Sequence, residues 1–147
     1  MARASTGTPN PRRLAMEVAS QALAGAGFAQ GLLDRSAAAA LLADADRRLA
    51  AELAYGVIRR RATLDAVLAA LAARPLVQVQ PAVLQALRLG AYQILFMDRI
   101  PPHAAVSESV RLARSTGHAA ATGFVNAVLR QLLRLARAVT GEPQAPP

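Results

Sequence analysis

The chain has 147 residues, which suits one folded domain, and no Cys, which excludes disulfides, thiolate metal sites and thiolate nucleophiles. All 17 basic residues are Arg, and against 9 acidic residues they give a net charge of +8. Such a surface favours a polyanion as partner, although an Arg- and Ala-rich composition is also what a GC-rich genome produces.

The amino terminus and the apolar runs give no sign of export or of a membrane span. No apolar run reaches the ~18–20 residues that a span needs, and residues 1–10 lack the apolar centre of a secretion signal. We therefore expect a cytoplasmic protein without a membrane partner. Residues 1–10 are polar with Pro and Gly and are expected to form a disordered leader.

The sequence pattern predicts an all-α fold, because Ala and Leu are strong helix formers and no segment alternates with strand periodicity. The first helix begins near Pro11 and ends at Gly25 and Gly27. A short helix is expected over Leu32–Ala43. Asp44 or Asp46 then caps a longer helix that runs to about Arg61.

Four further helices complete a domain of about seven helices over residues 11–139. Thr63 is expected to cap the fourth helix, which Pro75 stops. Pro81 and Pro102 open the fifth and sixth helices, and Gly117 ends the sixth. The seventh runs from about residue 119 to residue 139, and residues 140–147 have the Pro-rich composition of a tail or linker.

The seventh helix separates an apolar stripe from a basic one. At about 100° per residue, Arg130, Arg134 and Arg137 cluster opposite the apolar stripe, and no acidic residue occurs from residue 109 to residue 141, although Arg111 and Arg114 add to the charge there. Three Arg on one face repel one another unless an anion offsets them. The alternative is a solvated face that the helix dipole favours.

Two other groups of Arg complete the candidate RNA-binding residues. Arg12 and Arg13 occupy the positive end of the first helix dipole, which suits a phosphate, although both could lie in a frayed, solvated first turn. The consecutive run 59–61 fans around a helix end, so structural roles there are the stronger interpretation and Arg59 alone is kept. The predicted contacts to RNA phosphates are Arg12, Arg13, Arg59, Arg130, Arg134 and Arg137.

The remaining polar residues suggest no catalytic, cofactor or metal site. His103 and His118 have no second ligand at metal-site spacing, and no Gly-rich phosphate loop occurs. Glu108 is expected to pair with Arg111 or Arg114. Asn126 interrupts an apolar run and is expected to be buried and to tie helices together.

Several short motifs, in this order and spacing, resemble the NusB-type helical RNA-binding domains, and most of all the amino-terminal domain of the ribosomal RNA cytosine-5 methyltransferases (the RsmB or Sun group). The resemblance covers about residues 11–138 and departs from the family at Ser107 and Arg111. The residues that carry it are Arg12, Ala15, Asp46–Arg47, Leu53, Tyr55–Arg59, Leu64–Asp65, Leu87–Gln93, Ile100–Pro101, His103–Val106, Glu108 and Gly123–Arg130.

The resemblance implies two packed three-helix bundles with an extra helix and a non-catalytic module that helps a methyltransferase dock ribosomal RNA. Cytosine-5 methylation needs a Cys thiolate and a site for S-adenosylmethionine, so this chain cannot perform it alone. Two alternatives stay open: an antitermination factor that binds a short single-stranded RNA with a ribosomal protein, and a structural helical module. The expected partners are RNA, and a carboxyl-terminal catalytic domain or a ribosomal protein.

Overall fold

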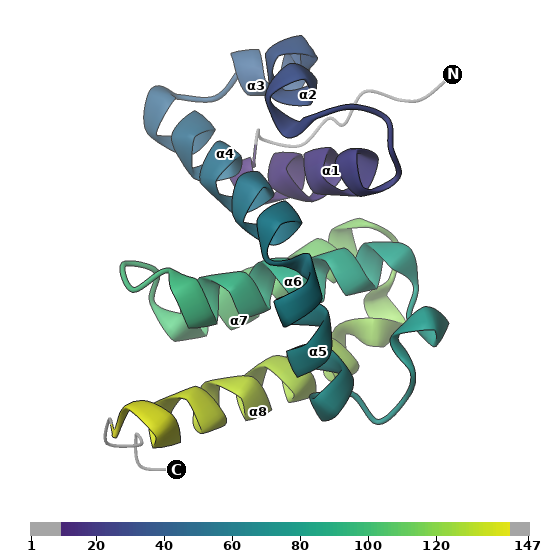
Figure 1. Cartoon of the computed structure of the whole chain (residues 1–147), viewed down its shortest axis with the longest axis vertical. Helices are drawn as coiled ribbons and strands as arrows, with labels where there is room; N and C mark the ends of the chain where they lie inside the picture. Colours follow the sequence, from purple (N-terminus) through teal and green to yellow (C-terminus); the bar gives the residue numbers. More distant parts are fainter. Residues whose placement is uncertain (1–9, 142–147) are drawn as a thin grey trace.

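The computed structural model describes residues 10–141, and this part of the chain is all-α, as the sequence predicts (Figure 1). Residues 1–9 and 142–147, which hold most of the expected leader and tail, lie outside the described residues. The helices are α1 (Pro11–Leu23), α2 (Ala29–Arg35), α3 (Ala37–Ala40), α4 (Asp44–Arg59), α5 (Arg61–Leu71), α6 (Pro81–Phe96), α7 (Pro102–Ser115) and α8 (Thr122–Thr140), with short 3₁₀ turns at Leu76–Gln78 and Ala119–Ala121.

The helix starts predicted at Pro and the helix ends predicted at Gly are confirmed. Pro11, Pro81 and Pro102 each open a helix, since the fixed φ of Pro suits the first turn and its missing N–H is not needed there. Gly25 and Gly117 follow helix ends with φ of +84° and +87°, where a side chain would strain the backbone.

Three predictions about the middle of the chain are wrong. The single short helix expected over Leu32–Ala43 is two helices, because the backbone of Ser36 is extended and its hydroxyl accepts a hydrogen bond from the Ala39 N–H to cap α3. Asp44 and Asp46 do not cap α4; they lie in its first turn, where their charges favour the helix dipole. Thr63 lies inside α5, which starts at Arg61 without a side-chain cap.

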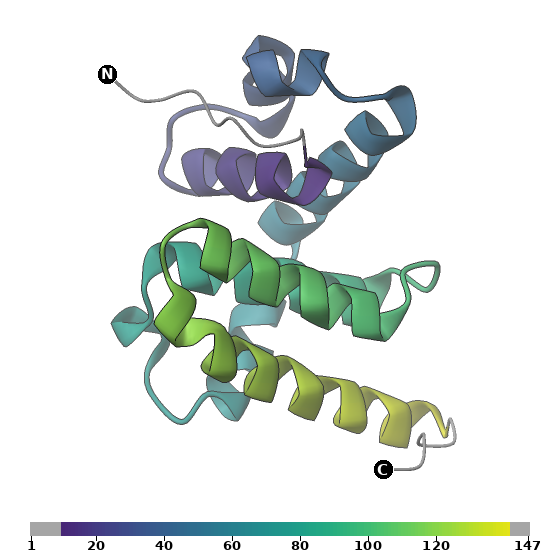
Figure 2. The same ribbon diagram turned by 180° about the vertical axis from the view of Figure 1, so that it is seen from behind.

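The helices form two small bundles, as the resemblance implies (Figure 1). In one, α1 packs along α4 and is covered by α2 and α3; in the other, α6 packs against α7 and α8, with α5 alongside. The fully buried leucines of the two bundles are Leu53, Leu64, Leu68, Leu87, Leu89 and Leu129. The view from behind shows α7 between α1 and α8 (Figure 2).

Two contacts fix the helices near the junction of the bundles, the first across the junction and the second within the second bundle. The Tyr92 ring of α6 lies flat on Gly56 of α4, so close that a Cβ atom on Gly56 would be under 3.0 Å from three ring atoms. Asp65 of α5 accepts two hydrogen bonds from Arg88 of α6, at 2.7 Å from Nε and 2.9 Å from Nη2. The orientation of α4, α5 and α6 therefore depends on a few close contacts.

Candidate nucleic-acid interface

A shallow groove of about 280 Å³ runs between α7 and α8, the two helices that lie side by side in Figure 2. Its apolar floor comes from Val106 and Val110. Its rim is polar and mostly cationic, with Ser107, Arg111 and Arg114 from α7 and Asn126 and Arg130 from α8. Three Arg therefore share one groove, although Arg130 lies on a different helix from Arg111 and Arg114.

Arg130 is held in place by a neighbour on its own helix. Its Nε donates a hydrogen bond to Oδ1 of Asn126 at 2.9 Å, one turn earlier in α8. Asn126 is half-exposed, so the prediction that it is buried and ties helices together is wrong. Because the amide uses one side of the guanidinium, the other N–H groups of Arg130 remain available to an anion.

The two Arg of α7 differ in their charge partners. Arg111 lies 3.7 Å from the Glu108 carboxylate, a pairing that the sequence predicts, but its side chain is 73% exposed and such a pair is weak. Arg114 is exposed, and no carboxylate of residues 10–141 lies within 4 Å of it. The groove is consequently a cationic site that intramolecular pairing leaves largely uncompensated.

The basic stripe continues along α8 beyond the groove. Arg134 is exposed and Arg137 is half-buried, and neither has a carboxylate within 4 Å in the described part of the chain. The core stripe of the same helix is buried as expected at Val125, Val128, Leu129 and Leu132. Arg130 and Arg134 thus face solvent on the side of α8 away from the core.

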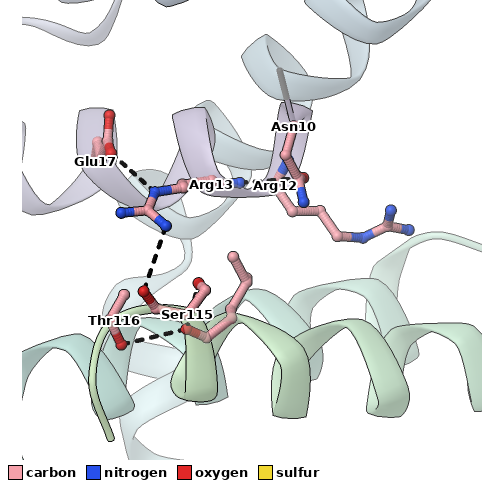
Figure 3. Close-up of polar contacts among 7 residues, drawn as sticks. Asn10, Arg12, Arg13, Glu17, Ser115 and Thr116 are labelled. Carbon is pink, nitrogen blue, oxygen red and sulfur yellow. Dashed lines mark hydrogen bonds and ion pairs between the residues drawn. The ribbon is translucent and has the colours of Figure 1, made fainter. Parts of the chain in front are cut away.

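Arg12 and Arg13 start α1 as predicted, but each also joins α1 to the second bundle. Arg12 Nε donates to the side-chain oxygen of Gln93, a buried residue of α6, at 2.9 Å. Arg13 reaches the Ser115 carbonyl at the end of α7 at 3.5 Å and lies 3.4 Å from Glu17 (Figure 3). Asn10 caps the helix by accepting from both backbone N–H groups, so the first turn is ordered.

Arg59 lies apart from the α7–α8 groove, at the exposed carboxyl end of α4. Its two neighbours have structural contacts, in line with the structural interpretation of this run: the Arg60 guanidinium stacks on the Phe96 ring at 4.4 Å, and Arg61 lies 3.9 Å from Asp65. Arg59 has no such ion pair or cation–π contact within residues 10–141.

The chemistry of the α7–α8 groove is that of binding. The guanidinium groups and the amide can donate hydrogen bonds to phosphate oxygens, and the valine floor can accept an apolar ring. The Ser107 hydroxyl already donates to the His103 carbonyl at 3.0 Å, so it can only accept from a ligand. Among residues 10–141, no group of three or more His, Asp or Glu could hold a metal ion. None of the described helices is long and apolar enough to cross a membrane.

Sequence reasoning did not select Arg111 and Arg114 as site residues, although it noted their charge. The usable signal was the stretch without acidic residues from 109 to 141. What the sequence could not supply is that α7 and α8 turn these two Arg toward Arg130.

The fold and the motifs together identify the class of protein. A family model described as the NusB family matches residues 9–134, so the chain belongs to the NusB family. The solved structure of T. maritima NusB has the same fold, with a TM-score of 0.71, 18% identity and coverage of 86% of this chain and 93% of that chain.

The sequence relatives lie in a more particular group. A Synechocystis protein named "Probable ribosomal RNA small subunit methyltransferase B" is 37% identical over 102 residues, which are 69% of this chain and 23% of that protein. The "Ribosomal RNA small subunit methyltransferase B" of Klebsiella pneumoniae is 38% identical over 101 residues, again 69% of this chain and 23% of that protein. The chain thus matches less than a quarter of the length of these methyltransferases.

Proposed function

We propose that this chain is an RNA-binding module that docks ribosomal RNA for cytosine-5 methylation and has no catalytic role of its own. The groove between α7 and α8 is the principal contact, with Arg111, Arg114 and Arg130 on phosphates. Arg134 and Arg137 extend the contact along α8.

The observation that carries the proposal is the convergence of three Arg from two helices on one groove. Within residues 10–141, Arg111 alone among them has an acidic partner, Glu108. Like charges held together on a folded surface are unfavourable unless an anion binds there. Single-stranded RNA offers closely spaced phosphates and unpaired bases, which match the cationic rim and the valine floor.

Arg12 and Arg13 are proposed as secondary contacts. Arg12 uses Nε on Gln93 and Arg13 is shared between Glu17 and Ser115, so each keeps free N–H donors on its terminal nitrogens. Their contacts within the protein make them partly structural, so substitutions here test stability and binding at once.

The relatives named as ribosomal RNA methyltransferases support ribosomal RNA as the ligand. The chain contains no Cys, and the methyl transfer in our proposal therefore belongs to a catalytic domain that works with this module. A location in the cytoplasm follows from that role.

The proposal is tested by measuring the affinity for a fluorescent single-stranded fragment of small-subunit ribosomal RNA at rising salt. Each phosphate contact adds about −0.7 to the slope of log K against log salt. Arg114→Glu with Arg130→Glu is expected to weaken binding and to reduce the steepness of the slope by about 1.4.

The matched control is Arg47→Glu with Arg48→Glu, which changes the net charge equally on exposed positions of α4. This control is expected to keep the wild-type slope. Equal losses in both double variants would show that net charge, and not the groove, determines binding, and would reject the site.

A further inference from the structure

A second, larger cleft lies in the first bundle, away from the α7–α8 groove. It has a volume of about 590 Å³ and lies where the end of α1 and the loop after it meet α2 and the last turns of α4. Ala22 and Ile58 give it an apolar floor. None of its lining residues is acidic.

An aromatic side chain stands unprotected at the edge of this cleft. Phe28, directly before α2, is 91% exposed and lines the cleft. Covering this ring with a ligand would remove apolar surface from water, which favours binding. Beside an open apolar floor, Phe28 leaves one ring face free for a flat ligand.

Another part of the cleft lining is polar and held in place by hydrogen bonds. The Tyr55 hydroxyl donates a hydrogen bond to the side-chain oxygen of Gln30, and Gln30 Nε2 donates to Asp34 Oδ1 at 2.8 Å. This chain of hydrogen bonds fixes the amide of Gln30, and it leaves one Gln30 N–H and the Tyr55 oxygen free to pair with the edge of a ring.

Two Arg without carboxylate partners lie next to residues that line the cleft. The Arg35 guanidinium lies against Gly27, a residue that lines the cleft, where a Cβ atom would be 3.3 Å from Nη2. Arg59 follows Ile58 and is one turn beyond Tyr55 on α4, so it is exposed on the same side of the helix. Neither has an ion pair within residues 10–141.

We propose that the cleft binds one unpaired nucleotide of the RNA, with its base stacked on Phe28 and its phosphate held by Arg35 and Arg59. This inference rests on the proposed RNA-binding function and adds to it a second site that holds a base. In this proposal Arg59, which lies apart from the α7–α8 groove, contacts RNA at the second site.

The charges favour a nucleotide over an apolar segment of a protein partner. An amphipathic peptide needs the apolar floor alone, whereas a nucleotide needs a flat aromatic face, hydrogen-bonding groups at the ring edge and a cation at the phosphate. Phe28 and the Tyr55–Gln30 pair supply the first two elements within the cleft, and Arg35 and Arg59 supply the third beside it.

The test compares Phe28→Ala with Val77→Ala, a control at an equally exposed apolar residue elsewhere, 92% exposed in the turn Leu76–Gln78. Phe28→Ala is expected to lower affinity for the single-stranded ribosomal RNA fragment about tenfold, as the loss of one base–aromatic stack does. It should leave the salt slope and the affinity for duplex RNA unchanged. Arg35→Ala with Arg59→Ala should instead reduce the steepness of the slope by about 1.4.

Photocrosslinking tests the cleft independently of the affinity measurements. RNA that carries 4-thiouridine is expected to form an adduct on Phe28 or Tyr55 when bound to the wild-type chain. An adduct confined to α7 and α8, together with wild-type affinity of Phe28→Ala, would overturn the cleft and leave the proposed function standing.

Two other outcomes also decide the matter. If the wild-type chain binds no RNA at low salt, the proposed function and the cleft both fail. If Phe28→Ala turns a dimer into a monomer in sedimentation while RNA affinity is unchanged, the cleft belongs to a second copy of the chain and the nucleotide proposal is overturned.

Discussion

The contact between Gly56 and Tyr92 makes a sharp prediction, because two opposed effects act on Gly56→Ala. Ala is better than Gly in the middle of a helix by about 0.5–1 kcal/mol. The new methyl group, however, would lie under 3.0 Å from three atoms of the Tyr92 ring, which is only 8% exposed. Such overpacking costs about 1–3 kcal/mol or more.

The clash should win, because a buried ring packed between helices cannot swing away as the end of a flexible side chain can. We expect Gly56→Ala to lower the free energy of unfolding by about 1–2 kcal/mol. Urea unfolding followed by circular dichroism measures it. Gly123→Ala is the control: nothing lies within 4 Å of a Cβ there, so this change in α8 should be neutral or stabilise by up to about 1 kcal/mol.

The same substitution in a Tyr92→Ala chain tests whether the Tyr92 ring causes the loss of stability. In a Tyr92→Ala chain the ring is gone, so adding Gly56→Ala should become neutral or stabilising. If Gly56→Ala alone is as stable as the wild type, or if it destabilises the Tyr92→Ala chain by the same amount, the close crossing of α4 over α6 is refuted.

Two further predictions concern single side chains. Asp65→Ala should destabilise by about 3 kcal/mol in urea unfolding, because it leaves Arg88, whose side chain is 11% exposed, without its partner; a loss below about 1 kcal/mol, as expected for the exposed pair at Asp44, would contradict this. Asn126→Ala should weaken binding to single-stranded RNA about two- to tenfold without changing the salt slope, since it frees Arg130 to move but removes no charge; unchanged affinity would show that Asn126 does not position Arg130.

Local signals in the sequence were enough for most of the helices. Pro11, Pro81 and Pro102 mark starts, and Gly25 and Gly117 mark ends, because their backbone preferences act within a few residues. The Ala-rich stretch before α4 was predicted wrongly because it contains no such local signal. Four consecutive Ala carry no periodicity, so nothing marked the break at Ser36 between α2 and α3.

The contacts of the candidate site depend on tertiary structure, and the sequence could place them only in part. The apolar and basic stripes of α8 follow from helical periodicity. The hydrogen bond from Arg12 to Gln93 joins residues 81 apart, and the meeting of Arg114 with Arg130 depends on how α7 packs on α8. Asn126 was misassigned because an Asn in an apolar run can equally bond a side chain one turn away on its own helix.

The central claim is that RNA binds in the groove between α7 and α8, and a titration by nuclear magnetic resonance tests it most directly. Isotope-labelled chain is mixed with a single-stranded fragment of small-subunit ribosomal RNA. The Nε–Hε signals of Arg111, Arg114 and Arg130 are expected to shift with the RNA concentration, while that of Arg47 stays in place. Shifts confined to α3 and the first half of α4, with none at the three groove Arg, would contradict the claim.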